Sequence, residues 1–310
     1  MKVAGLVLAA GQGSRLKKGA KALIESDEGF FVDLLLSSLF EAQLAPIYVV
    51  LGYEKDRVEE HLRSREFNVK IVVQEELLGT GHAVWCALKN MEESDYVVVC
   101  LVDVPLVTSA SIQKLVKFTA KQNLSACFAS MLVFEKNSYG RVIRDNFTKS
   151  VSSIVEAKHC DSHHLLNREV STGVFCFNFR HLKAVFDEYG EYLLNQCREQ
   201  GLEFYLPLVL EIFASKGMLF DALLFEDADE FIGVNTEEDL IALGKALNRR
   251  RVKKFVSKGV KFFDPESVWI SFKTNLEEGV EIGRDVEIWG ESFVKSGAKI
   301  LGYSYLKDCN

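Results

Sequence analysis

The chain has 310 residues, of which 48% are hydrophobic and 26% charged, an ordinary globular composition with room for one large and one small domain. Its formal net charge of −7 argues against a general nucleic-acid binder but is compatible with a phosphate ligand held by a few local cations. The seven cysteines are scattered without a CxxC pair, and the longest apolar run, residues 97–102, is far too short to span a bilayer, so we expect a cytoplasmic protein without a membrane segment, zinc site or disulfide framework.

Four short runs rich in Val, Ile and Leu have the length and composition of buried parallel strands: residues 3–9, 47–51, 69–73 and 96–101. Helical patterns lie between and after them, at residues 32–42, 54–63, 81–91 and 109–122. This alternation predicts an α/β fold with a Rossmann-like, mostly parallel sheet that is covered by helices on both faces.

Beyond residue 126 the pattern becomes richer in strands. Strand patterns occur at residues 127–134, 140–145, 151–156, 173–177 and 218–225. Helical patterns occur at residues 180–188, 203–215 and 236–250. We therefore expect a first domain that covers residues 1–250 and ends with the last of these helices.

From residue 268 an aliphatic residue recurs at every sixth position, which fits neither the 3.6-residue period of a helix nor the two-residue period of a strand. The recurring residues are Ile270, Leu276, Ile282, Ile288, Val294, Ile300 and Leu306. This period predicts a left-handed hexapeptide β-helix of about two coils. Residues 251–310 are therefore expected to form a linker and a β-helix stub, which must dock on the main domain, on a partner chain in a homo-oligomer, or on both.

The segment LAAGQGSR, residues 8–15, directly follows the first predicted strand. Gly11 and Gly13 allow the backbone to pass close to a bulky anion, so that its N–H groups can cradle phosphates. Arg15 and Lys21 would add cationic side chains for triphosphate oxygens. The spacing matches neither GxxxxGK[ST] nor GxGxxG, so a plain glycine turn with solvated cations stays open as the alternative.

The segment QEELLGTGHAV, residues 74–84, follows the third predicted strand. The amide of Gln74 can donate and accept hydrogen bonds, which suits the edge of a pyrimidine, and Gly79 and Thr80 open a helix whose N–H groups can face a ligand. The alternative is a strand–helix turn with Thr80 as its N-cap. His82 lacks an evident Ser or Cys partner, so we expect a structural role for it.

Asp103 follows the apolar strand at residues 96–101, separated from it by Val102. Open α/β sheets bind ligands at the carboxyl ends of their strands, and a carboxylate there suits Mg²⁺, which prefers oxygen ligands. The alternative is a turn or capping residue before Pro105. We favour the metal because the run that precedes Asp103 is wholly apolar.

Four further positions have a functional and a plain structural interpretation, and each alone favours the structural one. Gly140 can let a ligand approach the backbone or form a hairpin turn, and Glu156 can accept from sugar hydroxyls or be an exposed strand-end charge. Thr172 with Gly173 can form a ligand wall or a turn. Asn235 can supply an oxygen to a metal or cap the helix that follows.

Together, in this order and spacing, the segments resemble the pyrophosphorylase domain of bacterial N-acetylglucosamine-1-phosphate uridylyltransferases. That family has LAAGxGTRM…PK, QxxxLGTGHA, GDVPL, a YGR segment, IVE, NTG and GVN, followed by a hexapeptide β-helix. The counterparts here are LAAGQGSRL…AK, QEELLGTGHAV, VDVPL, SYGRVIR, SIVEAK, STG and GVNTEEDL. The match spans roughly residues 3–306, and LGTGHAV is its most diagnostic part.

The resemblance implies a role for each matching position. The nucleotide would be held by Leu8, Ala9, Ala10 and Gly11, its phosphates by Arg15 and Lys21, and its uracil end by Gln74, Gly79 and Thr80. The amino sugar would contact Gly140, Glu156 and Ser171, and Mg²⁺ would bind Asp103 and Asn235. Arg15, Lys21 and Asp103 would be the catalytic residues.

Three departures from the family pattern accompany this match. Val102 replaces a glycine beside the metal carboxylate, Ser171 replaces an asparagine near the sugar, and Ala20 replaces the proline before Lys21. The family's longer β-helix carries a second activity, acetyl transfer from acetyl-CoA. Because this chain contains about two coils, we expect that activity to be absent from it.

The predicted function is therefore Mg²⁺-assisted nucleotidyl transfer from UTP to a sugar-1-phosphate, N-acetylglucosamine-1-phosphate in the family, with release of pyrophosphate. Val102 and Ser171 leave two alternatives open. One is a pyrophosphorylase for another sugar-1-phosphate or nucleotide. The other is a non-catalytic protein that binds a nucleotide sugar.

Overall fold

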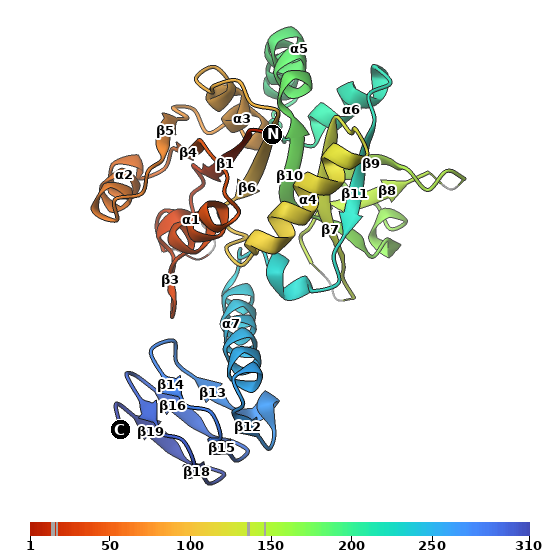
Figure 1. Ribbon diagram of the computed structural model, residues 1–310. Helices are drawn as coiled ribbons and strands as arrows, with labels where there is room; N and C mark the ends of the chain where they lie inside the picture. Colours follow the sequence, from red (N-terminus) through yellow and green to blue (C-terminus); the bar gives the residue numbers. More distant parts are fainter. Residues whose placement is uncertain (14–15, 17, 135–136, 146) are drawn as a thin grey trace. The chain divides into compact units, whose positions relative to one another are not determined.

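The computed structural model describes residues 1–13, 16, 18–134, 137–145 and 147–310. It divides the chain into two compact units (Figure 1). The first comprises Met1–Ile24 and Phe30–Asn235, and the second comprises Glu25–Gly29 and Thr236–Asn310. No helix in the described part of the chain is long and apolar enough to cross a membrane.

The first unit is built on a sheet whose strands run in the order β11-β7-β10-β6-β1-β4-β5, with β8 and β9 attached beside β10. Their bounds are β1 Val3–Ala9, β4 Ile47–Leu51, β5 Lys70–Val73, β6 Tyr96–Leu101, β7 Ala126–Leu132, β8 Arg141–Arg144, β9 Val151–Val155, β10 Glu169–Asn178 and β11 Phe220–Leu224. Strand β1 pairs in parallel with both β4 and β6, whereas β10 is antiparallel to β6 and β7. The prediction of a mostly parallel sheet is confirmed.

Helices cover both faces of this sheet: α1 Phe31–Glu41, α2 Lys55–Ser64, α3 Thr80–Leu88, α4 Ser109–Lys121, α5 Phe179–Glu199 and α6 Leu208–Ser215. Ala4, Leu6 and Leu8 of β1 join one buried cluster with residues of α3, α5 and α6. On the other face, Leu39 of α1 lies where a side chain at Gly5 would be, 3.3 Å from its ideal Cβ. Because both faces of β1 are buried, its sequence is a continuous apolar run.

Two helix predictions in the first unit are wrong in extent, and a third, at residues 236–250, ends seven residues too early. Helix α5 continues to Glu199, eleven residues beyond the predicted end, because Gly190 inside it gives room to Trp85 of α3, 2.8 Å from its ideal Cβ. Helix α6 begins at Leu208 and not at residue 203. Phe204 exchanges backbone hydrogen bonds with Leu78 (2.8 Å) and Gly81 (2.7 Å), which holds residues 203–207 in an extended connection.

The hairpin of β8 and β9 carries Gly140 just before β8 and Glu156 just after β9. It is an outlying part of the sheet, since the described pairing of β8 with β10 consists of one register position, Arg141 with Val170. The amide of Ser171 adds a hydrogen bond to the carbonyl of Gly140 (2.9 Å). The position of the hairpin therefore depends on further side-chain contacts.

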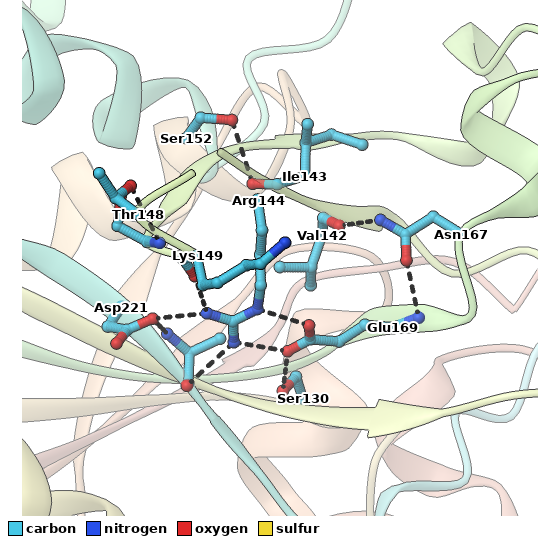
Figure 2. Close-up of polar contacts among 12 residues, drawn as sticks. Ser130, Val142, Ile143, Arg144, Thr148, Lys149, Ser152, Asn167, Glu169 and Asp221 are labelled. Atoms are coloured by element: carbon cyan, nitrogen blue, oxygen red, sulfur yellow. Dashed lines mark hydrogen bonds and ion pairs between the residues drawn. The ribbon is translucent and has the colours of Figure 1, made fainter. Parts of the chain in front are cut away.

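Arg144, the last residue of β8, supplies these contacts at the far end of the hairpin (Figure 2). Its guanidinium donates two hydrogen bonds to Glu169 of β10 (2.7 and 2.8 Å) and one to Asp221 of β11 (3.0 Å). Ser130 of β7 also donates to Glu169 (2.7 Å). Burial alone would raise the pKa of Glu169, but the hydrogen bonds from Arg144 and Ser130 hold this pKa below its usual range.

The second unit contains helix α7, Glu237–Ser257, and a stack of short strands. The strands are β12 Lys261–Phe262, β13 Trp269–Ile270, β14 Asn275–Leu276, β15 Glu281–Ile282, β16 Glu287–Trp289, β17 Phe293–Val294, β18 Lys299–Ile300 and β19 Tyr305–Lys307. They pair in parallel as three sheets, β12-β15-β18, β13-β16-β19 and β14-β17. Trp269 pairs with Glu287 and Glu287 with Tyr305, steps of 18 residues or three hexapeptides, which confirms the predicted β-helix stub.

The observed division differs from the predicted boundary at residue 250, because all of α7 belongs to the second unit. Val252 and Phe255 of α7 join the buried cluster of the β-helix. The side chain of Asn248 donates to the carbonyl of Val268 (2.7 Å) and accepts from the amide of Ile270 (2.9 Å). The helix thus covers the first coil, a contact that a linear pattern of apolar residues does not contain.

We predict that Arg144→Ala lowers the free energy of unfolding by about 2–4 kcal/mol, because it leaves Glu169 without its charge-assisted hydrogen bonds. Urea unfolding followed by circular dichroism measures the change. Arg180→Ala is the matched control, because Arg180 and Glu93 form a surface pair whose side chains are 78% and 68% exposed. The control should lose less than about 1 kcal/mol, and equal losses for the two variants would contradict the prediction.

Candidate functional site

The parallel pairing of β1 with β6 brings two predicted segments to one edge of the sheet. Leu8 pairs with Leu101, and the amide of Val102 donates to the carbonyl of Leu8 (3.1 Å). The glycine segment after β1 and Asp103 after β6 therefore leave the sheet side by side. A cavity of about 540 Å³ lies at this edge, within the first unit.

Most of the predicted site residues line this one cavity. They are Leu8, Ala10, Gly11, Gly13, Lys21, Gln74, Gly79, Thr80, Asp103, Gly140, Glu156, Ser171 and Asn235. Ala9 does not, because it is fully buried within β1. Arg15 lies outside the described residues.

Lys21, Asp103 and Asn235 meet in the cavity although they are far apart in the sequence. Nζ of Lys21 donates to Oδ2 of Asp103 and to Oδ1 of Asn235, both at 2.6 Å. The amide of Val234 donates to the carbonyl of Asp103 (2.8 Å), which fixes the segment before Asn235 beside the end of β6.

The oxygen atoms of Asp103 and Asn235 fit a hard divalent cation. Oδ1 of Asp103 is buried and accepts no hydrogen bond from the described residues, so it has an unused lone pair. Carboxylate and amide oxygens are ligands that Mg²⁺ takes, with water and substrate phosphates completing its shell. No cluster of three or more His, Cys, Asp or Glu side chains suited to a metal occurs among the described residues.

The two glycines of the first segment differ in what surrounds them. A Cβ on Gly11 would meet no atom of the described residues within 4 Å, so their packing leaves open space there for a ligand. A Cβ on Gly13 would lie 3.0 Å from the carbonyl oxygen of Gly19, which also accepts from the Gly13 amide (3.0 Å). Gly13 is thus required by the loop itself, and its amide is already bonded.

The segment at the start of α3 has a structural task of its own. Gly79 has φ +109°, and its ideal Cβ would lie 2.5 Å from the carbonyl oxygen of Phe204. Oγ1 of Thr80 accepts from the amide of Leu206 (2.9 Å). The amide group of the buried Gln74 donates to the carbonyl of Gly79 (3.1 Å). These residues therefore hold the segment 203–207 against α3 as well as lining the cavity.

The prediction that His82 lacks a Ser or Cys partner is corrected by Cys86, whose Sγ lies 3.6 Å from Nε2 of His82. Burial lowers the pKa of His82 and raises the pKa of the Cys86 thiol. Both groups are therefore neutral near pH 7, and the thiol lacks the thiolate character of a nucleophile. The expected structural role of His82 agrees with this chemistry.

The segment 203–207 contributes lining residues that the sequence reading missed: Glu203, Tyr205, Leu206 and Pro207. The hydroxyl of Tyr205 accepts from Nζ of Lys158 (2.6 Å), which also lies over the ring. Burial raises the pKa of the nearby Glu156, Lys158 opposes this shift, and the charge of Glu203 adds to it. The sequence EFYLP of residues 203–207 has no pattern of apolar residues that distinguishes it from the first turn of a helix, so the predicted helix at residues 203–215 includes it.

The departures Val102 and Ser171 also lie in the cavity wall. Their residues are 2% and 8% exposed, so both are packed into the wall and do not block the opening. Next to Ser171 the strand bulges. Two features favour glycine at position 173: its φ is +82°, and a Cβ there would lie 2.7 Å from Cδ1 of Leu101.

Residues 5–138 match the family of the MobA-like NTP transferase domain. Over 299 residues the chain is 31% identical to the bifunctional protein GlmU of Carboxydothermus hydrogenoformans, covering 96% of this chain and 63% of that protein. It is also 31% identical over 292 residues to the bifunctional protein GlmU of Acetivibrio thermocellus, covering 94% and 60%. The chain therefore spans less than two thirds of the length of these relatives.

Two solved structures share the fold. UDP-glucose pyrophosphorylase complexed with UDP-glucose superimposes with a TM-score of 0.60 at 16% identity, and a CMP-2-keto-3-deoxy-manno-octonic acid synthetase complexed with CTP with 0.60 at 13% identity. Each match covers 81% of this chain and 100% of the other. These two likenesses concern the fold alone, whereas the sequence of the chain is similar to GlmU proteins over almost its whole length and to the NTP transferase domain over residues 5–138.

Proposed function

We propose that this chain transfers a nucleotidyl group from UTP to a sugar-1-phosphate, N-acetylglucosamine-1-phosphate, and releases pyrophosphate. The observation that carries the proposal is the meeting of Lys21, Asp103 and Asn235 beside the open space at Gly11. A cationic side chain, two oxygen ligands and an unobstructed backbone turn are the groups that a magnesium triphosphate requires.

The chemistry follows from the charges of the reactants. An oxygen of the sugar phosphate attacks the α-phosphorus of UTP in line, the new P–O bond forms, and the bond to the β-phosphate oxygen breaks. The phosphate is already ionised at neutral pH, so no general base is needed. The main barrier is the repulsion between two anions, and positioning and charge neutralisation lower it.

Each group of residues in the site would reduce this repulsion between the two anions in its own way. Lys21, together with Arg15, would neutralise the triphosphate and the leaving pyrophosphate. Backbone around Gly11 would approach the phosphates closely. Asp103 and Asn235 would hold Mg²⁺, which when bound screens the charge of both phosphates.

The sugar would occupy the side of the cavity formed by the β8–β9 hairpin and β10. Gly140 leaves the backbone accessible there, and the partly buried carboxylate of Glu156 can accept hydrogen bonds from sugar hydroxyls. Gln74, Gly79 and Thr80 would border the uracil end. The amide nitrogen of Gln74 donates to the carbonyl of Gly79 and also lies 3.0 Å from Nδ1 of His82, so the carbonyl oxygen of Gln74 is the atom left for the base.

A second candidate function is transfer to a different sugar or from a different nucleotide. The branched side chain of Val102 in the cavity wall is the observation that favours it. Pyrophosphate release across a panel of nucleoside triphosphates and sugar-1-phosphates separates the two. We expect the highest kcat/KM with UTP and N-acetylglucosamine-1-phosphate. Turnover with another pair and none with any uridine pair would establish the second candidate, and Val102→Gly would show whether that side chain sets the preference.

We predict that Asp103→Asn lowers kcat by at least about 10²-fold at saturating substrate and shifts the Mg²⁺ requirement to higher concentration, because the site loses its carboxylate charge. Pyrophosphate release at several Mg²⁺ concentrations measures both effects. Asp187→Asn on the surface of α5 is the control and should behave as wild type. Full activity of Asp103→Asn at low Mg²⁺ would refute the proposed metal site.

We predict opposite effects of Glu156→Gln on binding and on stability. The lost carboxylate should raise KM for the sugar phosphate by about tenfold or more and leave KM for UTP unchanged. Initial rates with each substrate varied in turn measure the two constants. An equal rise in both would argue against a role for Glu156 at the sugar.

The stability effect follows from the pKa of Glu156, which burial raises above its ordinary value of 4.5. The folded protein therefore loses stability as pH rises from the ordinary to the raised value, because the buried group must ionise. Glu156→Gln should unfold at higher urea concentration than wild type at pH 7, and the difference should disappear below the ordinary value. A less stable variant at pH 7 would contradict this.

A further inference from the structure

Lys21 occupies the place where the proposed metal would bind. Its ammonium lies 2.6 Å from one oxygen of Asp103 and 2.6 Å from the oxygen of Asn235. The side chains of Lys21 and Asp103 are 16% and 15% exposed, so water screens this ion pair weakly. These are the same two side chains that would hold Mg²⁺.

The backbone keeps Lys21 in this position. Its amide donates to the carbonyl of Gly11 (3.3 Å), and its carbonyl accepts from the amide of Ile24 (3.2 Å). The amide of the preceding Ala20 donates to Oε2 of Glu54 (3.3 Å). These hydrogen bonds hold the backbone of Lys21 in place. Its side chain can therefore move from Asp103 and Asn235 to a nearby ligand oxygen without a rearrangement of the loop.

Oδ1 of Asp103 has a lone pair that no described residue uses, but a cation shared with Asn235 must also take the amide oxygen that accepts from Nζ of Lys21. Mg²⁺ binds oxygen at about 2.0–2.1 Å, so a cation shared by Asp103 and Asn235 would lie against Nζ of Lys21. The two positive charges would repel each other strongly in this partly buried place. A cation that approaches the ligand-free protein must therefore displace Lys21 first.

We propose that Lys21 acts as an internal counter-cation: its ammonium prevents metal binding to Asp103 and Asn235 until a nucleoside triphosphate offers it other oxygens. The inference rests on the proposed function and adds an order to it: metal enters together with the nucleotide and not before it. Triphosphate and metal then favour each other's binding, since the first removes the competitor of the second. A purely structural ion pair would have no such effect on metal affinity.

The test is Mn²⁺ binding to the full chain without nucleotide, followed by the electron paramagnetic resonance signal of free Mn²⁺. Mn²⁺ takes the same oxygen ligands as Mg²⁺ and is visible in this measurement. We expect Lys21→Met to lower the Kd for Mn²⁺ by at least about tenfold, because the competing charge is gone. Lys21→Arg, which keeps the charge, should stay near wild type.

Two controls identify the site. Lys55→Met removes a lysine that pairs with the exposed Glu75 and should leave the Kd as in wild type. Adding Asp103→Asn to Lys21→Met should abolish the gain, which assigns it to the carboxylate. Circular dichroism and urea unfolding establish that each variant is folded, and Lys21→Gln replaces Lys21→Met if that variant is not.

Unchanged or weaker Mn²⁺ binding by folded Lys21→Met and Lys21→Gln overturns the inference. A gain that persists in the double variant with Asp103→Asn overturns it as well. The result is independent of turnover. If the wild-type chain turns over but Lys21→Met does not bind Mn²⁺ more tightly, only the counter-cation role of Lys21 is refuted. If Lys21→Met binds Mn²⁺ more tightly but the wild-type chain shows no turnover, only the proposed activity is refuted.

Discussion

The parallel pairing of β1 with β6 is the constraint on which the site depends. It places the chain that follows Ala9 next to the chain that follows Leu101, so a glycine turn and a carboxylate leave the sheet at the same edge. Lys21 then reaches Asp103 and Asn235 across sequence separations of 82 and 214 residues. An antiparallel pairing would have placed Gly11 and Asp103 at opposite ends of the sheet, and no shared ligand could have joined them.

The same residues serve packing and the proposed chemistry, which explains why the motif segments are so dense in glycine. Gly79 lies where the chain of Phe204 crosses, whereas Gly11 has free space around it. The fold requires a glycine at position 79, whereas at position 11 only the proposed ligand would require one. The polar groups follow the same division: the Thr80 hydroxyl is bonded to Leu206, whereas Oδ1 of Asp103 accepts no hydrogen bond from the part of the chain that the structure describes. Polar groups without a hydrogen-bond partner, in a cavity wall whose other polar groups are bonded, indicate where substrate and metal would bind.

The sequence predicted the elements whose signal is local. Strands β1, β4 and β6 have the predicted bounds because they are buried on both faces. The six-residue period predicted the β-helix because the same pairing between strands 18 residues apart repeats along it. Contacts between distant segments could not be predicted in this way. The connection at residues 203–207 is extended because of Leu78 and Gly81, and α7 belongs with the β-helix through Asn248. The contact of Lys21 with both Asp103 and Asn235 also has no local signal, although each of the three was singled out alone.

The central claim is that Asp103 and Asn235 bind the metal of a nucleotide complex beside Gly11. Anomalous diffraction from a crystal grown with Mn²⁺ and a non-hydrolysable UTP analogue tests it most directly. We expect one manganese peak within bonding distance of Oδ1 of Asp103, with phosphate density at the Gly11 turn and Nζ of Lys21 on a phosphate oxygen. A manganese peak bound to other side chains, with the analogue away from the β1–β6 edge, would contradict the account.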